Sequence, residues 1–335
     1  PPAVLSANEN PLGPSPKAIA AYGEAIHLNR YPDGGATQLR QTLATQFGLD
    51  VNRIVCGAGS DELITLLIRC YVGPGDEVLQ TQHGFLMYGI TAKTVGATPV
   101  LAPETPDLHT DVDALLACVT DKTRICFVAN PNNPTGTYIP GSELRRLRDG
   151  LREDILLVID AAYSEYVDAS DYSDGCDLVE DYQNVVMLRT FSKLYGLAAL
   201  RLGWCYAPEA VVDALNRVRS PFNVNNSAQA AGIAALGDQD HVEISLAQNA
   251  EQLKRLCGAL SQLGLGFPPS VCNFVLIRFN DADTAKRALS HLADQGVIVR
   301  SVAGYGLAES LRATIGTAAE NDRLIAGLTD FMNKG

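Results

Sequence analysis

The sequence predicts an α/β fold, in which a mainly parallel sheet forms a large domain and a smaller α+β domain follows. Between Thr37 and Leu236, short apolar runs alternate with amphipathic stretches. That alternation is typical of parallel strands connected by helices. After Gly237 the pattern changes to a long helical stretch over 242–263 and separated strand candidates. We therefore end the large domain, residues 30–237, at that glycine.

The strand candidates of the large domain are short apolar runs, long enough for a strand and too short for a helix. They are 77–80, 124–129, 155–160, 185–188 and 203–206. The Gly-Ala-Gly-Ser-Asp-Glu run over 57–62 precedes the apolar periodic run 63–68, so its amides are expected to form the N-terminus of a helix. In the smaller domain we expect a strand at 273–279, a helix at 282–293 and a strand at 311–315.

The composition excludes several classes of partner. The chain has 335 residues, 47% of them hydrophobic, and a net charge of −12. Nucleic acids and anionic membrane surfaces attract basic proteins, so neither is an expected partner, and an anionic ligand must be held by individually placed arginines. No apolar stretch approaches the roughly 20 residues of a membrane span. The Pro-Pro-Ala start is not expected to be a signal peptide.

The cysteines and histidines give no sign of a metal site. The eight cysteines include no Cys-x-x-Cys pair, and the five histidines make no metal-ligand spacing with one another or with cysteine. Free thiols in a reducing compartment explain the cysteines better than a disulfide framework. We therefore expect a cytoplasmic protein without a metal.

The most informative motif surrounds Lys193. It is the run Thr190-Phe191-Ser192-Lys193-Leu194-Tyr195-Gly196-Leu197, with Arg201 eight positions after the lysine. A Schiff-base lysine must lose its proton readily. A bound phosphate needs hydroxyl donors and a bidentate guanidinium, which this run and Arg201 supply. A solvated surface turn is the alternative, because Ser-Lys followed by Gly is common in turns.

Two further motifs follow strand candidates. Asn130-Pro131-Asn132-Asn133-Pro134-Thr135-Gly136 follows 124–129, and Asp160-Ala161-Ala162-Tyr163 ends 155–160. Ligands in such folds bind at the carboxyl ends of the strands, where these motifs and Lys193 fall. A carboxylate for a pyridinium nitrogen, with an amide and a phenol for a ring hydroxyl, suits a pyridine cofactor. An ordinary Asn/Pro turn and a structural aspartate or helix N-cap are the alternatives.

With these residues the chain resembles the fold type I pyridoxal-phosphate (PLP) enzymes, specifically the class I and II aminotransferases, and among them the histidinol-phosphate aminotransferases. The resemblance extends from Asn8-Glu9-Asn10-Pro11-Leu12-Gly13 to Leu311-Arg312-Ala313-Thr314-Ile315-Gly316. It implies a sheet of the seven-stranded type in the large domain. It also implies that residues 1–29 pack with 238–335 as the small domain.

The resemblance implies a role for each candidate residue. Lys193 would bond the cofactor and act as the catalytic base, Asp160 would hold the pyridine nitrogen, and Tyr163 with Asn133 would contact the ring oxygen. Phe85 would stack on the ring, and Tyr31 would reach the phosphate in the neighbouring subunit, which makes a homodimer the expected assembly. The phosphate ligands implied within the chain are Ser60, Asp61, Thr190, Ser192 and Arg201. The alternatives are a plain helix N-cap for the 57–62 turn and a core aromatic for Phe85.

The resemblance also implies the substrates. Arg312 would bind the α-carboxylate of glutamate or 2-oxoglutarate, Arg300 would bind the phosphate of the amino donor, and Asn10 would be a third substrate contact. An arginine in an apolar strand needs an anionic partner, so structural ion pairing competes with ligand binding at both arginines. The implied reaction transfers the amino group of L-histidinol phosphate to 2-oxoglutarate. Its products are imidazole-acetol phosphate and L-glutamate, and it belongs to histidine biosynthesis.

Three other functions fit parts of the pattern. An aromatic-amino-acid aminotransferase or a threonine-phosphate decarboxylase would keep the cofactor residues and differ in the substrate pocket. A non-catalytic module of the same fold would be expected to lack Lys193 or Asp160. A nucleotide-binding enzyme would need a Gly-x-Gly-x-x-Gly turn, and Gly57-Ala58-Gly59 begins that pattern but is followed by Glu62 at the last glycine position.

Overall fold

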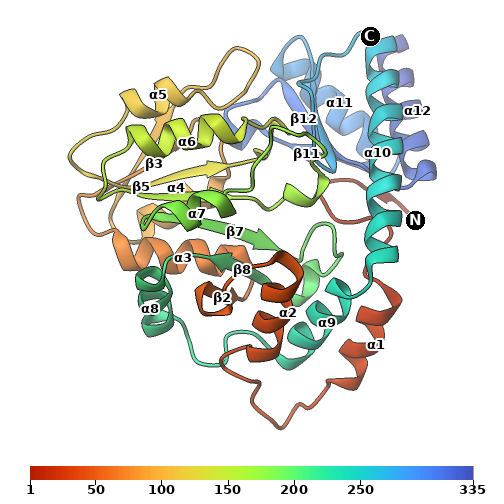
Figure 1. The fold of residues 1–335 in the computed structure, drawn as a ribbon. Coiled ribbons are helices and arrows are strands. Elements are labelled where there is room, and N and C mark those ends of the chain that lie inside the picture. The colour runs from red at the N-terminus through yellow and green to blue at the C-terminus, as the bar shows by residue number, and fades with distance from the viewer. Residues whose placement is uncertain (335) are drawn as a thin grey trace.

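A seven-stranded sheet forms the centre of the computed structural model, which describes residues 1–334 (Figure 1). Its strands are β2 (Ile54–Gly57), β3 (Glu77–Thr81), β4 (Thr98–Ala102), β5 (Thr123–Ala129), β6 (Leu156–Asp160), β7 (Val185–Thr190) and β8 (Gly203–Tyr206). Across the sheet they lie in the order β2-β8-β7-β6-β5-β3-β4. β8 is antiparallel to both of its neighbours, and the other adjacent pairs are parallel. The α/β class with a mainly parallel sheet is therefore confirmed.

Helices cover both faces of this sheet. In β6, Leu157 and Ile159 pack into one hydrophobic cluster, whereas Leu156 and Val158 pack into another. Successive side chains of a strand point to opposite faces, so a strand covered on both faces must be apolar throughout. One face is covered by α2 (Thr37–Phe47), α5 (Val112–Ala117), α6 (Gly141–Gly150), α7 (Cys176–Asp181) and α9 (Asn226–Leu236), and the other by α3 (Ser60–Tyr71), α4 (Leu86–Thr94) and α8 (Glu209–Val218).

The C-terminal part builds a second hydrophobic core. Its antiparallel sheet has the order β11-β12-β9, and the helices α10, α11 and α12 pack beside it (Figure 1). The bounds are β9 (Phe274–Arg278), β11 (Arg300–Ser301), β12 (Ser310–Thr314), α10 (Gln239–Gln262), α11 (Ala282–Asp294) and α12 (Ala318–Lys334). The elements expected here are present, although α10 begins at Gln239 rather than at 242. Short 3-10 helices occur at Val51–Arg53, Ser164–Tyr166, Ala198–Leu200 and Ala303–Tyr305.

The N-terminal segment crosses between the two parts. Its first strand, β1 (Ala3–Val4), pairs in parallel with β10 (Val297–Ile298) of the C-terminal part. Its helix, α1 (Pro16–Glu24), begins at the cap Ser15 and packs on α9. The residues between β1 and α1 run past Lys193, whose Nζ donates a hydrogen bond to the carbonyl of Ala7 at 3.2 Å. A segment that belongs to neither helical layer thus forms one wall of the carboxyl-end region.

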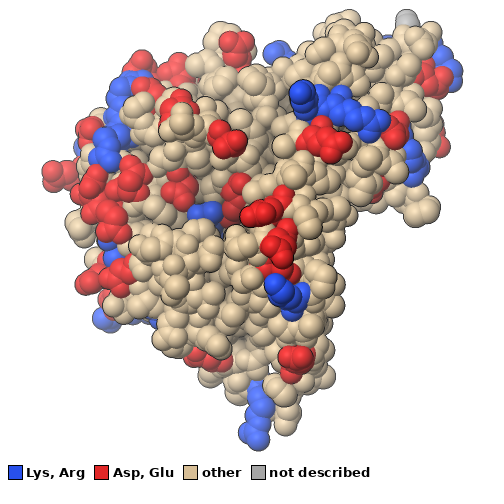
Figure 2. All heavy atoms as spheres, turned by 45° about the vertical axis from the view of Figure 1, so that its right-hand side comes forward, with Lys and Arg blue, Asp and Glu red and all other residues tan. Residues whose placement is uncertain are grey.

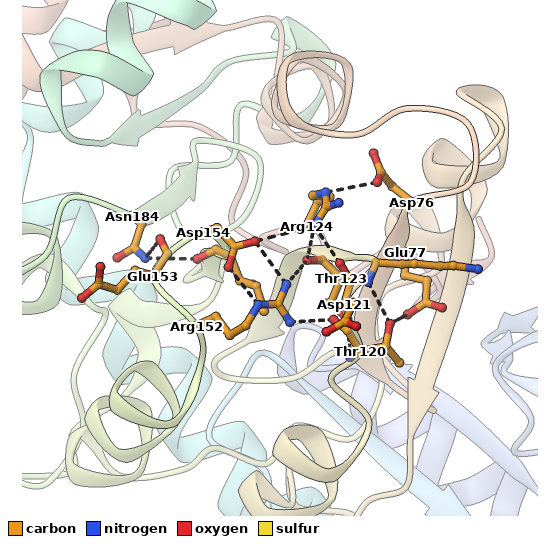
Figure 3. Close-up of polar contacts among 12 residues, drawn as sticks. Asp76, Glu77, Thr120, Asp121, Thr123, Arg124, Arg152, Glu153, Asp154 and Asn184 are labelled. Atoms are coloured by element: carbon orange, nitrogen blue, oxygen red, sulfur yellow. Dashed lines mark hydrogen bonds and ion pairs between the residues drawn. The ribbon is translucent and has the colours of Figure 1, made fainter.

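Ion pairs close the opposite edge of the sheet, where β3, β5 and β6 begin (Figure 3). Arg124 Nε lies 3.1 Å from Asp76 Oδ1, and Arg152 Nε lies 2.9 Å from Asp154 Oδ1. Arg152 also donates to the carbonyl of Thr120 at 2.6 Å. With the amino edge occupied by these contacts, the carboxyl edge is the one open to a ligand, as the α/β architecture favours.

The surface carries mixed charge, and acidic and basic side chains are interspersed on the face shown in Figure 2. Among residues 1–334, no helix is long and apolar enough to cross a membrane. The eight cysteines are free thiols, and those at positions 56, 126, 205 and 272 are buried.

Candidate active site

A cavity of about 240 Å³ lies at the carboxyl edge of the parallel strands. Strand ends, the start of α3 and the N-terminal segment all contribute to its wall. The structure brings together there most of the residues predicted from the sequence, namely Ser60, Asp61, Phe85, Asn133, Asp160, Tyr163, Thr190, Ser192, Lys193 and Arg201. The parallel topology explains this, because it places the ends of β5, β6 and β7 beside one another.

Lys193 lies in the loop that follows β7, where little water reaches its amine. Burial lowers the pKa of Lys193 to about 8, and the nearby cation of Arg312 acts in the same direction. The ammonium lies 5.7 Å from the ring centroid of Tyr163. A lysine with this pKa provides a substantial fraction of neutral amine near neutral pH, which is what a nucleophile or a base requires.

Asp160 is the last residue of β6 and is buried. Burial raises the pKa of Asp160 to about 6, against hydrogen bonds that favour the ionised carboxylate. Those bonds come from the hydroxyl of Tyr88, 2.6 Å from Oδ2, and from the N–H of Ala162, 3.3 Å from Oδ1. A buried carboxylate held in this way is prepared to receive a cationic N–H group, which would stabilise its charge.

Tyr163 and Asn133 also line the cavity, and each is held by a second residue. Asn8 donates from Nδ2 to the hydroxyl of Tyr163 at 2.9 Å. Arg312 donates to Oδ1 of Asn133 and, at 2.8 Å, to the carbonyl of Ser6. The amide group of Asn133 therefore has a fixed orientation, since its oxygen is engaged and its nitrogen remains the donor.

The start of α3 and Arg201 form a cradle suited to an anion. The N-cap residue Gly59 has φ +83°, and it has no side chain to occupy the N–H groups of the first turn. A Cβ at Gly59 would lie 2.5 Å from Arg201 Nη2, and one at Gly203 would lie 2.4 Å from the backbone nitrogen of Ser60. Arg201 lies 3.2 Å from Asp61 Oδ2. Only glycines allow this approach of a helix N-terminus and a guanidinium, both of which bind phosphate.

Four predicted residues do not line the cavity. Arg312 is buried behind Asn133, and Arg300 pairs with it in register on β11. Asn10 is buried, and its amide nitrogen is committed to the carbonyl of Leu194 at 2.7 Å and to Ser245 Oγ at 3.1 Å. Tyr31 is 83% exposed and stacks on Phe222, with 4.7 Å between the ring centroids.

Comparison with known proteins agrees with this geometry. The family model described as aminotransferase class I and II matches residues 2–328. The chain belongs to this family. A histidinol-phosphate aminotransferase of Paramagnetospirillum magneticum (strain ATCC 700264 / AMB-1) is 57% identical over 331 residues, which are 98% of this chain and 91% of that protein. One of Rhodospirillum centenum (strain ATCC 51521 / SW) is 53% identical over 332 residues, with 98% and 91% covered.

Solved structures give the same result for the fold. The histidinol-phosphate aminotransferase of Sinorhizobium meliloti in complex with pyridoxal-5'-phosphate has a TM-score of 0.94 and 30% identity, over 99% of this chain and 91% of that one. An aspartate aminotransferase of Thermus thermophilus, 22% identical, has a TM-score of 0.87 over 99% and 91% of the two chains. The predicted membership of the class I and II aminotransferases and the predicted fold type are thereby confirmed.

The cavity of this aminotransferase fits pyridoxal phosphate. It offers an amine for the aldehyde, a buried carboxylate for the ring nitrogen, and an amide and a phenol for the ring oxygen. The glycine cradle beside Arg201 has the room and the donors that a phosphate needs. Phe85 offers an aromatic face within the same cavity.

Sequence reasoning missed two residues that this aminotransferase places against the site. Tyr88 holds Asp160, and Asn8 holds Tyr163. Tyr88 lies three positions after Phe85 on α4, which is the spacing that puts two side chains on one face of a helix. That spacing could have singled out Tyr88, whereas nothing local distinguishes Asn8 from its neighbour Asn10.

Proposed function

We propose that this chain is a pyridoxal-phosphate-dependent aminotransferase that transfers the amino group of L-histidinol phosphate to 2-oxoglutarate, giving imidazole-acetol phosphate and L-glutamate. The observation that carries the proposal is the amine of Lys193, placed in one cavity with the buried carboxylate of Asp160 and the anion cradle at α3. The substrate is proposed from the relatives named above, which carry that activity in their names at 53–57% identity.

Different cavity residues would contact different parts of the cofactor. Lys193 would bond it covalently, Asp160 would hold its ring nitrogen, and Phe85 would cover the ring. Ser60, Asp61, Thr190, Ser192 and Arg201 would surround the phosphate, chiefly through the N–H groups of α3 and the guanidinium. Pyridoxal phosphate, when bound, withdraws electrons from the α-carbon of the amino donor and so makes its proton removable.

Lys193 is the residue that moves this proton. Its lowered pKa provides a neutral Nζ able to accept the α-proton. The resulting ammonium can then return the proton in a later step of the amino-group transfer. Asp160 would keep the ring nitrogen protonated, because its ionised carboxylate would accept a hydrogen bond from the ring N–H in a site with little water. Asn133 Nδ2 and the Tyr163 hydroxyl would donate hydrogen bonds to the ring oxygen.

Arginines would select the anionic substrates. We propose that Arg312 binds the α-carboxylate of glutamate, while its bonds to Asn133 and Ser6 keep the guanidinium in place. Arg300, beside it on β11, would bind the phosphate of the amino donor. Asn10 would act on the substrate indirectly, because its amide holds the carbonyl of Leu194, the residue that follows the catalytic lysine.

The proposed assembly is a homodimer in which Tyr31 completes the site of the partner. Its support is a group of exposed apolar side chains on α1 and the adjacent loop, which include Ile19, Tyr22, Ile26, Leu28 and Tyr31. Such a group favours burial against a second copy. We also propose residues 30–237 as the cofactor-binding domain, residues 1–29 with 238–335 as the small domain, and the cytoplasm as the location.

A single-turnover experiment tests the substrate. The PLP-loaded protein is mixed with L-histidinol phosphate, L-phenylalanine or O-phospho-L-threonine, and the absorption change from the pyridoxal to the pyridoxamine form is followed. Fast conversion with histidinol phosphate and slow conversion with phenylalanine are expected. A preference for phenylalanine would indicate an aromatic aminotransferase, and release of carbon dioxide from phosphothreonine would indicate a decarboxylase.

A further inference from the structure

The loop between β3 and α4 carries two aromatic rings with different surroundings. Phe85 lines the cavity, as described above. His83 is buried and faces the segment 302–307 of the C-terminal part. The loop therefore touches both the cofactor cavity and the part of the chain that contributes Arg300 and Arg312.

The His83 ring makes a specific contact with that segment. Nδ1 lies 2.6 Å from the backbone carbonyl oxygen of Tyr305. A carbonyl oxygen only accepts hydrogen bonds, so Nδ1 must carry the proton. The other ring nitrogen, Nε2, lies 3.8 Å from Glu104 Oε2, and Glu104 Oε1 accepts the backbone N–H of His83 at 2.8 Å. Glu104, whose side chain is almost fully buried, thus holds the backbone of His83 and lies beside its ring.

The segment itself is shaped to receive the ring. Gly306, next to Tyr305, has φ +84°, and a Cβ there would lie 3.2 Å from His83 Cε1 and 3.3 Å from Nδ1. Glycine is therefore required at this position both for the backbone conformation and for close packing against the imidazole. The contact therefore combines the hydrogen bond to the Tyr305 carbonyl with close packing of the His83 ring against Gly306.

The residue whose carbonyl is held lies in the turn between the strands of the proposed substrate arginines. Tyr305 stands between β11 and β12, which carry Arg300 and Arg312. The two arginines are paired in register, so this turn joins the two strands that hold them side by side. Moving the Tyr305 backbone would therefore move the turn that connects the proposed carboxylate and phosphate subsites.

We propose that His83 is a positioning residue for the amino donor, which fixes Tyr305 and the arginines around it relative to the cofactor-stacking loop. The inference rests on the proposed function for the identity of the donor. It does not require His83 to touch substrate or cofactor. Its effect is on how well the anionic donor is bound, because this contact and the packing around Gly306 join the arginine-bearing segment to the loop of Phe85.

Two substitutions separate the hydrogen bond from the bulk of the ring. In His83→Asn, the Asn Nδ2 takes the place of His Nδ1 and can still donate to the Tyr305 carbonyl, whereas His83→Leu leaves that carbonyl without its donor. We expect His83→Leu to raise KM for L-histidinol phosphate and for L-glutamate about tenfold, with kcat changed less than about threefold, and His83→Asn to stay within about threefold of wild type in both constants. Affinity of the apoprotein for PLP and the melting temperature of the PLP-loaded protein are measured beside them and are expected to stay close to wild type.

Several results would overturn the inference. They are an unchanged KM for both donors in His83→Leu, an equal loss in His83→Asn and His83→Leu, or a fall in kcat alone. If His83→Leu does not fold, Gly306→Ala serves in its place, because its Cβ pushes against the His83 ring, and an unchanged KM there counts against the inference as well. Failure of the proposed function would look different, since the wild-type protein would then convert glutamate but not histidinol phosphate, and the KM comparison would proceed with glutamate.

Discussion

At the scale of single residues, the site depends on removing water from two groups of opposite charge. Burial lowers the pKa of Lys193 to about 8 and raises the pKa of Asp160 to about 6. Both shifts have the same cause, because a site with little water disfavours the charged form of either group. The neighbouring residues then adjust each group separately, with Arg312 acting on the lysine and Tyr88 on the aspartate.

The first prediction concerns the pH at which Lys193 reacts. Only the neutral amine attacks an aldehyde, so covalent attachment of pyridoxal phosphate should speed up as pH rises through about 8 and level off above it. An ordinary exposed lysine would show its midpoint near about pH 10.4. The apoprotein is incubated with PLP at a series of pH values and reduced with borohydride, and the modified Lys193 peptide is quantified by mass spectrometry. A midpoint near about pH 10.4 would contradict the prediction.

The second prediction concerns the hydrogen bond from Tyr88 to Asp160. In Tyr88→Phe the carboxylate loses a donor that lowers its pKa, so the pKa of Asp160 should rise above about 6. The protonated acid holds a pyridinium poorly, and the affinity of the apoprotein for PLP should fall about tenfold, more at pH 6 than at pH 8. Equilibrium titration of the apoprotein with PLP at the two pH values measures this.

A matched control is available on the surface. Tyr182 donates to Asp149 Oδ1 at 2.5 Å, also a tyrosine–aspartate hydrogen bond but an exposed one outside the cavity. Tyr182→Phe should leave PLP affinity unchanged. Equal behaviour of the two variants would mean that the Tyr88 bond is only structural.

At the scale of elements, the position of α3 decides the anion cradle. The helix starts directly behind β2 and lies against β8, where Gly203 leaves room for the backbone of Ser60. The apolar side of α3, which includes Leu63, Ile64 and Leu67, fixes the helix to the sheet. Core packing thereby aims the N-terminus of α3 at the cavity.

The third prediction tests that placement. Gly203→Ala inserts a Cβ 2.4 Å from the Ser60 nitrogen and should push the start of α3 away, which would weaken binding of PLP and of inorganic phosphate to the apoprotein about tenfold or more. Both affinities are measured by calorimetry. Gly258→Ala, on α10 with no atom near its new Cβ, is the control and should leave both unchanged while raising stability by about 0.5–1 kcal/mol. Phosphate affinity unaltered by Gly203→Ala would argue against α3 as the phosphate ligand.

At the scale of the whole molecule, the surface around α1 carries large apolar side chains that the single chain leaves exposed. Leu28 is 97% exposed and Tyr31 is 83% exposed, although both side chains are large and mostly apolar. The stacking of Tyr31 on Phe222 covers only one side of its ring. A second copy would bury these side chains and would bring Tyr31 to a site that its own chain does not provide.

The fourth prediction is complementation between two defective variants. Lys193→Ala lacks the base and should be inactive, and Tyr31→Ala should be weakly active at low PLP concentration because its partner site lacks a phosphate ligand. A mixed dimer contains one site with both residues intact, so co-expression of the two variants should restore about a quarter of wild-type activity if subunits pair at random. Activity no greater than that of Tyr31→Ala alone would show that Tyr31 serves its own chain or none.

The sequence was sufficient for the fold class and for the cavity residues that follow strand ends. Asp160 ends β6, while Lys193 and Asn133 lie in the loops that follow β7 and β5, and parallel topology brings such positions to one edge whatever the details of packing. The anion cradle was also readable, because Gly59 and Ser60 precede a periodic helix. These are local signals, carried by residues adjacent along the chain.

Only the tertiary structure decided which residues hold these groups. The pairs Tyr88 with Asp160, Asn8 with Tyr163, and His83 with Tyr305 join segments that are distant in the sequence. The family resemblance implies a substrate contact for Asn10, yet the amide nitrogen of Asn10 donates to the Leu194 carbonyl and to Ser245 Oγ within the chain. A polar side chain forms a hydrogen bond with the partner that tertiary packing places within about 3 Å of it. Hydrophobic periodicity in the sequence does not indicate which partner that is. Periodicity determines which face of an element is buried, and the packing of one element against another determines which polar groups then meet.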